Sequence, residues 1–364
     1  KVSGIVLGVK TLTPVLDYDI DYLQGRILLS QPLPATADDD LLVQSGSISG
    51  NPVFLVVRYE FTPGFYDPDT LAAGGRGHYW FNDHIKIGVT ASQDEQADIE
   101  NSLGGADLTL RKSSASWFKL ETGRTKGPGV LATTSIDGGY NFGIPDVFDD
   151  SDVDASAYRL DASLGFKDFF KSGRGRVTFY FQDLDAGYSA PGLATAGEST
   201  QYGGTVDMPF TDRLSARLKM DKQDQQEGLE TEAGELDLDY RMGEHWTMGL
   251  GVRHDSRKDN SAEVPETQEE GDRTDAAARL LYDSHARWTT YGFVQETIQA
   301  NGNREDNGRI GAGGSLRLTD RFNVTGEVSG GDLGTGCKLG TEYLYSDKTT
   351  LYNNYTLENE RTDN

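Results

Sequence analysis

The strongest constraint on the fold is a strict alternation of apolar and polar residues, which recurs from about residue 84 onward. In residues 213–222 every second side chain is apolar and the side chains between them are mostly charged, and residues 232–241 and 245–255 repeat this pattern. A period of two places all apolar side chains on one face of an extended strand and all polar ones on the other. The alternation therefore predicts consecutive β-hairpins with one apolar and one charged face.

The same rule predicts fifteen strands, and most of them have the ~9–11 residues that a tilted strand needs to cross a bilayer. They are residues 84–92, 105–111, 115–122, 156–166, 174–184, 199–209, 213–222, 232–241, 245–255, 273–282, 286–298, 307–318, 321–329, 335–345 and 349–359.

The connections between these strands alternate in length. Residues 211–213, 242–245 and 284–287 are tight polar turns, whereas residues 257–273 form a long acidic stretch between two hairpins. Short turns on one side and long polar loops on the other are typical of transmembrane β-barrels. The longest predicted loop, residues 123–154, is expected on the external side.

Aromatic residues gather beside the short turns. In a barrel such residues form a girdle at the level of the lipid headgroups, although aromatic residues at strand ends could also fill the core of a soluble sandwich. The predicted girdle consists of Phe166, Phe210, Tyr240, Trp246, Tyr282, Trp288, Phe322 and Tyr345.

Composition excludes several other classes of protein. Only 36% of the residues are apolar, and no apolar run approaches the ~20 residues of a membrane-spanning helix. With 34 Lys and Arg against 58 Asp and Glu, the net charge of −24 leaves no basic surface for nucleic acid. The single cysteine, Cys337, excludes an internal disulfide framework and a cysteine-based zinc site.

The first part of the chain has a different pattern. Residues 1–61 contain short strands separated by Pro, Gly and an acidic run, which indicates a small, soluble β-sandwich-like module that we expect to be incomplete. We expect residues 62–77 to be a linker and residues 78–364 to be the barrel. Because single-chain bacterial barrels have even strand numbers, fifteen strands predict at least sixteen and a barrel incomplete at its C-terminus.

Both ends of the chain carry segments that resemble a known class of protein. These are residues 17–22 (DYDIDY), 25–33 (GRILLSQPL), 53–61 (VFLVVRYEF), 340–350 (GTEYLYSDKTT) and 355–364 (YTLENERTDN). They resemble the barrel, and the β-module before it, of very large Gram-negative outer-membrane proteins with immunoglobulin-like repeats. The resemblance implies an all-β antiparallel transmembrane barrel in the bacterial outer membrane, and it transfers no catalytic residue. The chain departs from this class by ending in Arg-Thr-Asp-Asn, where such barrels usually end in an aromatic residue.

The polar face of the predicted barrel carries charges of both signs on neighbouring strands, which allows cross-strand ion pairs in a hydrated lumen. Such a face is either a wall that only needs to be polar because it meets water, or the lining of a selective conduit. The predicted lumen-facing residues are Arg159, Asp161, Arg176, Arg213, Arg217, Lys219, Asp221, Glu235, Asp237, Asp239, Arg241, Arg253, Asp275, Arg279, Arg317, Glu327, Lys338 and Glu342.

No arrangement of residues in the sequence predicts catalysis, and no cofactor is expected. Asp150, Asp152 and Asp154 form a weak candidate site for Ca²⁺ in the longest loop, but the glycine and the distal glutamate of an EF-hand are missing. A solvated acidic loop explains the same residues more simply.

These patterns predict a non-enzymatic outer-membrane β-barrel that acts as a pore, or as a membrane anchor for a soluble β-domain in an envelope assembly. Its expected partners are outer-membrane lipid, lipopolysaccharide and other envelope proteins, not nucleic acid. The alternatives are a gated, energy-coupled uptake receptor and a barrel component of a secretion or assembly machine.

Overall fold

The computed structural model describes most of the chain from residue 71 onward and short pieces before it. The described residues are 18–21, 26–29, 36–37, 42–43, 51–52, 71–96, 99–127, 153–190, 193–195, 197–226, 228–260, 270–346 and 349–358. Apart from one short 3₁₀ turn, η1 (Phe166–Asp168), the regular elements among these residues are β-strands. None of the described segments is a helix long and apolar enough to cross a membrane.

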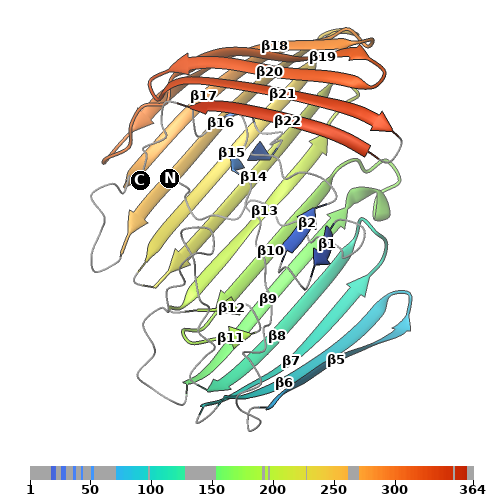
Figure 1. The fold of residues 1–364 in the computed structure, drawn as a ribbon, viewed down its shortest axis with the longest axis vertical. Helices are drawn as coiled ribbons and strands as arrows, with labels where there is room; N and C mark the ends of the chain where they lie inside the picture. Colours follow the sequence, from blue (N-terminus) through green and yellow to red (C-terminus); the bar gives the residue numbers. More distant parts are fainter. Residues whose placement is uncertain are drawn as a thin grey trace.

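Sixteen strands form one antiparallel sheet in which each strand pairs with its neighbour along the chain, apart from an inserted two-stranded ribbon (Figure 1). The strands are β5 (Leu71–Asn82), β6 (Ile85–Gln96), β7 (Ile99–Arg111), β8 (Trp117–Gly127), β9 (Val153–Gly165), β10 (Arg176–Leu184), β13 (Ser199–Pro209), β14 (Leu214–Gln225), β15 (Leu229–Arg241), β16 (Trp246–Asp259), β17 (Gly271–Asp283), β18 (Trp288–Ala300), β19 (Arg309–Thr319), β20 (Phe322–Gly331), β21 (Gly334–Ser346) and β22 (Thr349–Glu358). The prediction of an all-β, up-and-down antiparallel sheet of the barrel type is confirmed, and all fifteen predicted strands are present.

The sixteenth strand, β5, was missed by the sequence analysis. It begins at Leu71, inside the segment expected to be a linker, and pairs with β6 along its length. Gly74, Gly75 and Gly77 interrupt the alternation of side chains in this strand, so the period-two signal is weak there. The large sheet therefore has sixteen strands among the described residues, and its first hairpin begins at the end that carries the long loops.

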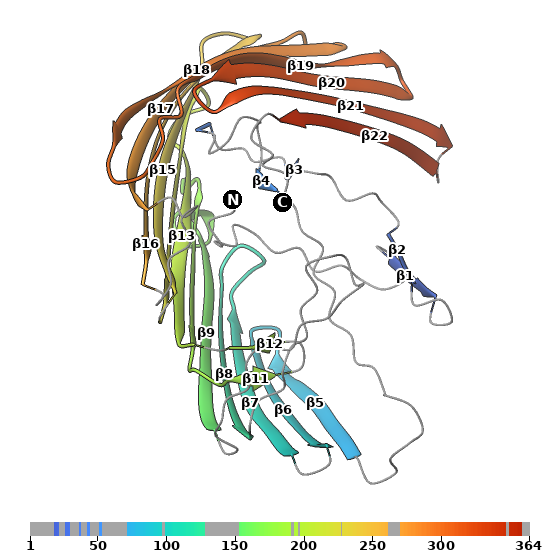
Figure 2. The same cartoon turned by 60° about the vertical axis from the view of Figure 1, so that its left-hand side comes forward.

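The sheet curves strongly, so that it has a concave and a convex face (Figure 2). Strands β5 and β22 are its two edges, and within the described residues neither pairs with a second strand. Since β5 begins and β22 ends at the same end of the sheet, Leu71 and Glu358 both lie at the end with the long loops.

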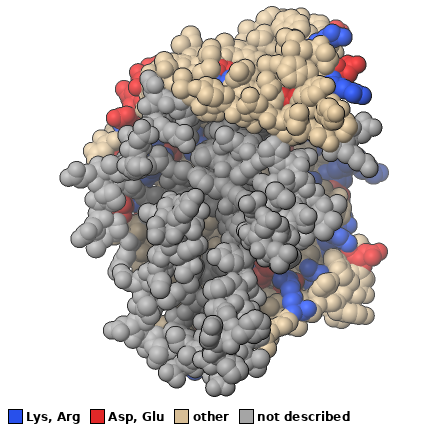
Figure 3. All heavy atoms as spheres, viewed as in Figure 1, with Lys and Arg blue, Asp and Glu red and all other residues tan. Residues whose placement is uncertain are grey.

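The two faces differ in polarity, as the alternation predicts. Five leucine and valine side chains of the convex face illustrate this with exposed fractions of 36–57%: Leu218, Leu236, Leu238, Val252 and Val328. Their polar neighbours face the concave side, where several carboxylates are almost completely buried. Figure 3 shows a largely uncharged surface over β18–β21, with charged side chains toward its edges.

The N-terminal region contains two small ribbons among its described residues. Strand β1 (Tyr18–Asp21) pairs with β2 (Arg26–Leu29), and the two-residue strands β3 (Thr36–Ala37) and β4 (Asn51–Pro52) pair with each other. Most of residues 1–61, where the sequence predicts short strands, lies outside the described residues.

Candidate functional site on the inner wall

A ladder of alternating charge crosses the concave face, which we call the inner wall. Lys219 pairs in register with Glu235, Glu235 with Arg253, and Arg253 with Asp275, on four successive strands. Arg253 Nη1 lies 3.2 Å from Glu235 Oε2, and the carboxylate of Glu235 is only 2% exposed. Opposite charges on directly paired residues attract, so the strand register itself places each charge beside its partner.

The predicted lumen-facing residues differ in how deeply their side chains are buried. Asp221, Glu235, Asp237, Asp275 and Glu327 are buried in the inner wall. Asp161, Arg217, Lys219, Asp239, Arg253, Arg279 and Lys338 are half-buried, whereas Arg159, Arg176, Arg213, Arg241, Arg317 and Glu342 are exposed. Ion pairs join Arg159 to Asp161 at 2.8 Å, Arg217 to Asp207 at 2.7 Å and Arg279 to Asp239 at 3.8 Å.

Small residues interrupt the charged ladder and form a recess in the inner wall. Gly251 pairs in register with Asp237 on one side and with Ala277 on the other, and Gly249 precedes it on the same face of β16. The side chain of Leu42 fills this recess: a β-carbon added at Gly251 would lie 3.0 Å from Leu42 Cβ, and one at Gly249 would lie 3.3 Å from Leu42 Cδ1. The recess therefore exists because these positions carry almost no side chain.

Two backbone amides hold the same segment against buried carboxylates. Leu42 N–H donates to Asp237 Oδ2 at 3.3 Å, and Val43 N–H donates to Glu235 Oε1 at 3.1 Å. Leu42 and Val43 are only 6% and 3% exposed. Full burial of a leucine side chain contributes about 1.5–3 kcal/mol, and a hydrogen bond to a charged group about 1.5–3 kcal/mol. These contacts together hold Leu42 and Val43 against the inner wall.

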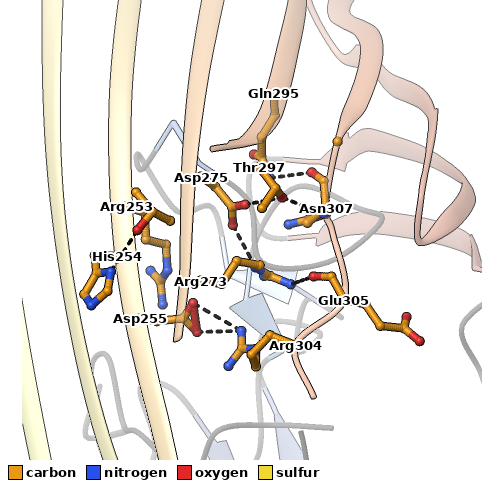
Figure 4. Close-up of polar contacts among 12 residues, drawn as sticks. Arg253, His254, Asp255, Arg273, Asp275, Gln295, Thr297, Arg304, Glu305 and Asn307 are labelled. Carbon is orange, nitrogen blue, oxygen red and sulfur yellow. Dashed lines mark hydrogen bonds and ion pairs between the residues drawn. The ribbon is translucent and has the colours of Figure 1, made fainter. Parts of the chain in front are cut away.

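A second segment, residues 301–308 between β18 and β19, folds against the inner wall (Figure 4). The side chain of Arg304 is completely buried, and its Nη2 donates to both carboxylate oxygens of Asp255, at 3.1 and 2.8 Å. Removing one partner of such a buried pair leaves an uncompensated charge, which makes the contact a firm anchor for this loop.

Further hydrogen bonds fix the same loop along its length (Figure 4). Arg273 Nε donates to Asp275 at 2.9 Å, and its Nη1 donates to the main-chain oxygen of Glu305 at 3.2 Å. Gln295 donates to the main-chain oxygen of Asn307 at 3.1 Å, while Asn307 N–H donates to the hydroxyl of Thr297 at 2.7 Å. The loop is thus bound to the wall through its backbone as well as through Arg304.

A third segment, the connection between β10 and β13, covers another patch of small residues. It carries the ribbon β11 (Ser189–Ala190) and β12 (Leu193–Ala194), and its Tyr188 packs with Ala155 and Ala157 in a buried cluster. A β-carbon at Gly123 would lie 2.4 Å from the hydroxyl oxygen of Tyr188, so glycine is required beneath the ring. Burial raises the pKa of the Tyr188 phenol above its usual value, and the charge of Glu121 adds to this.

The structure brings part of the predicted aromatic girdle together at the short-turn end. Tyr282 lies between Trp246 and Trp288, with ring centroids 4.9 Å from each, and Phe322 packs edge to face against Tyr343. Tyr240, Phe210 and Tyr345 are exposed at this end, and Phe166 starts the η1 turn.

The weak calcium candidate gains no support from the described residues. Asp154 is engaged by Arg124, whose guanidinium nitrogens lie 2.6 and 2.5 Å from its two carboxylate oxygens. Asp150 and Asp152 lie outside the described residues, and among the residues that are described no group of three possible metal ligands occurs.

Several residues of the inner wall were missed by the sequence analysis. Asp255 and Arg273 continue the alternation that marks their strands, so the same rule could have found them. Nothing in the local sequence marks Arg304, Leu42 or Val43 as inward-facing, because each lies outside the strands of the sheet and reaches the wall through tertiary contacts.

The fold and its inner wall define the class of this chain: a large up-and-down antiparallel sheet of barrel type, with an apolar outer face and a charged inner face. No protein-family model matches the sequence, and no curated protein matches it. A solved structure that is similar in fold is the ferric-catecholate import receptor Fiu from E. coli K12, with a TM-score of 0.39 and 10% identity over 79% of this chain. The match spans 64% of the receptor.

Proposed function

We propose that this protein is a non-enzymatic outer-membrane β-barrel that works as a gated conduit, closed by the segment that contains Leu42 and Val43. The observation that carries this proposal is the docking of that segment in the recess of Gly249, Gly251 and Ala277, with its amides on Glu235 and Asp237. This favours a gated barrel over a permanently open pore.

The polarity of the two faces supports the membrane part of the proposal. A soluble protein has little reason to expose large aliphatic or aromatic side chains on strand after strand of one face while burying carboxylates on the other. In a bilayer the convex face meets lipid, the concave face meets water, and the aromatic residues at the short-turn end lie at the headgroups. Outer-membrane lipid and lipopolysaccharide are then its immediate surroundings.

The charged ladder behind the docked segment supports the conduit part. When the segment leaves, Glu235 and Asp237 lose two hydrogen-bond donors and face the lumen beside Arg253 and Arg279. A lumen with both signs of charge is hydrated and discriminates weakly between small ions.

A reversible cross-link tests the gate directly. The β-carbon of Leu42 lies 3.0 Å from the position that a β-carbon at Gly251 would occupy, close to the separation of ~3.5–4.5 Å in disulfides. We expect L42C with G251C, in a Cys337→Ser background, to form a disulfide under oxidising conditions and to hold the conduit closed. Reduction should restore conductance in planar bilayers.

The matched control is the L42C single variant, which should conduct equally under oxidising and reducing conditions. If the cross-linked protein conducts as well as the reduced protein, the segment does not gate the barrel. If neither form conducts, the protein is an anchor or scaffold instead of a conduit.

A further inference from the structure

The convex face carries an apolar groove at the short-turn end of β6–β10, with a volume of about 580 Å³. Its lining includes a row of side chains that pair in register across the strands, from Ile85 through Leu110, Phe118 and Ala162 to Phe179. Ala162 is the smallest member of this row and lies between two phenylalanines. The row therefore forms a channel across the outer surface instead of a flat wall.

A cation lies at the turn-side mouth of the groove. Lys112 Nζ lies 4.1 Å from the ring centroid of Phe169, and both residues line the groove. Its ammonium donates to the main-chain oxygen of Asp168 at 2.7 Å, and its charge also acts on the carboxylate of Asp168, with which it forms no described ion pair. On the neighbouring loop Lys167 and Lys171 are exposed.

The two turns that form this mouth are tied together. The carboxylate of Asp168 accepts hydrogen bonds from the hydroxyls of Ser113 and Ser116, each at 2.5 Å. Asp168 thereby joins the β7–β8 turn to the η1 loop and fixes Lys112 beside Phe169. The cation is held at one position relative to the groove.

We propose that this groove binds a membrane phospholipid with an anionic headgroup, its acyl chain lying along the apolar row and its phosphate on Lys112. This inference rests on the proposed membrane location. An apolar channel matches an acyl chain, and positive charge at the headgroup level matches the phosphate. Lys167 and Lys171 add to the positive potential around the same headgroup.

Tryptophan fluorescence gives a local readout when the tryptophan is placed at Leu164, which lines the groove and is exposed on the convex face. The protein has four tryptophans, so Leu164→Trp in a background without them reports on the groove, and a variant that keeps only Trp288 reports on the exposed girdle elsewhere. Each is reconstituted in phosphatidylcholine vesicles that contain a small fraction of either phosphatidylglycerol or phosphatidylcholine with brominated acyl chains, which quench nearby tryptophan.

We expect brominated phosphatidylglycerol to quench the tryptophan introduced by Leu164→Trp at about fivefold lower fraction than brominated phosphatidylcholine, the ratio that corresponds to ~1 kcal/mol per cation. Lys112→Gln should abolish this difference. Lys258→Gln removes the same charge from an exposed position at the long-loop end of β16, far from the groove. It should leave the difference in quenching between the two lipids unchanged.

Equal quenching of the tryptophan at position 164 by the two lipids, while Trp288 is quenched by both, would overturn the lipid site and leave the membrane location intact. Absence of quenching at both tryptophans would instead overturn the proposed membrane location, and the lipid site with it.

Discussion

Substitution of Gly251 by alanine tests whether the recess holds the gating segment. The added methyl group would lie 2.6 Å from Asp237 Oδ1, 3.0 Å from Leu42 Cβ and 3.1 Å from Leu42 Cδ2. Real contacts of this kind are longer, so the carboxylate of Asp237 and the side chain of Leu42 have to shift. Both the burial of Leu42 and the hydrogen bond from its amide to Asp237 are then weakened.

The size of the effect follows from these contacts. Loss of a buried leucine side chain costs about 1.5–3 kcal/mol, and each 1.4 kcal/mol changes an equilibrium tenfold. A shift of Leu42 loses part of this burial, so we expect Gly251→Ala to raise the open probability of the reconstituted protein by up to about a hundredfold in single-channel recordings.

The matched control is Gly292→Ala, on the lipid-facing side of β18. A β-carbon there meets only the main-chain oxygen of Gly311, at 3.9 Å. This variant should behave as the unmodified protein does. If Gly251→Ala shows the same open probability as Gly292→Ala, the reasoning from the recess is refuted.

Three further predictions follow from the two faces and the turns. Leu238→Arg on the convex face should lower the unfolding free energy in bilayers by ~2–4 kcal/mol, whereas Glu342→Arg at an exposed position of the inner wall should change it little; equal losses would contradict the assignment of faces. Arg304→Gln should lower the free energy of unfolding by about 3–5 kcal/mol and expose residues 301–308 to hydrogen exchange, because it leaves the charge of Asp255 unpaired. The double variant with Asp255→Leu should regain much of this free energy, and no recovery would show that the ion pair does not anchor the loop. Hydrogen bonds from the hydroxyls of Ser113 and Ser116 lower the pKa of Asp168, and the charges of Lys112 and Lys167 add to this. These contacts therefore stabilise the two turns above the usual carboxyl pKa and are lost as the pH falls through the lowered pKa, where amide exchange of residues 112–116 should accelerate. In Asp168→Asn this exchange should not respond to the same pH change.

Much of the sheet could be predicted because its determinants are local. In residues 232–241 the alternation of leucine with aspartate and glutamate fixes both the strand and its two faces, and the turn at residues 242–245 fixes its partner. Prediction failed at β5, where glycines carry no side chain to display a period.

The inner wall shows where local patterns stop being informative. Gly249, Gly251 and Ala277 appear in the sequence as ordinary small residues of a strand, and only the register of three neighbouring strands reveals that they form one recess. The segment that fills it lies 192–195 residues away along the chain from the carboxylates that it contacts.

The sequence by itself therefore determined the strands, their order and the polarity of each face, because an extended chain alternates its side chains and short turns pair adjacent strands. The tertiary structure decided what lies against the inner wall. Leu42, Arg304 and Tyr188 reach that wall only after the sheet has curved and its small residues have come into register. Contacts of that kind depend on distances across the folded sheet, which no periodicity along the chain contains.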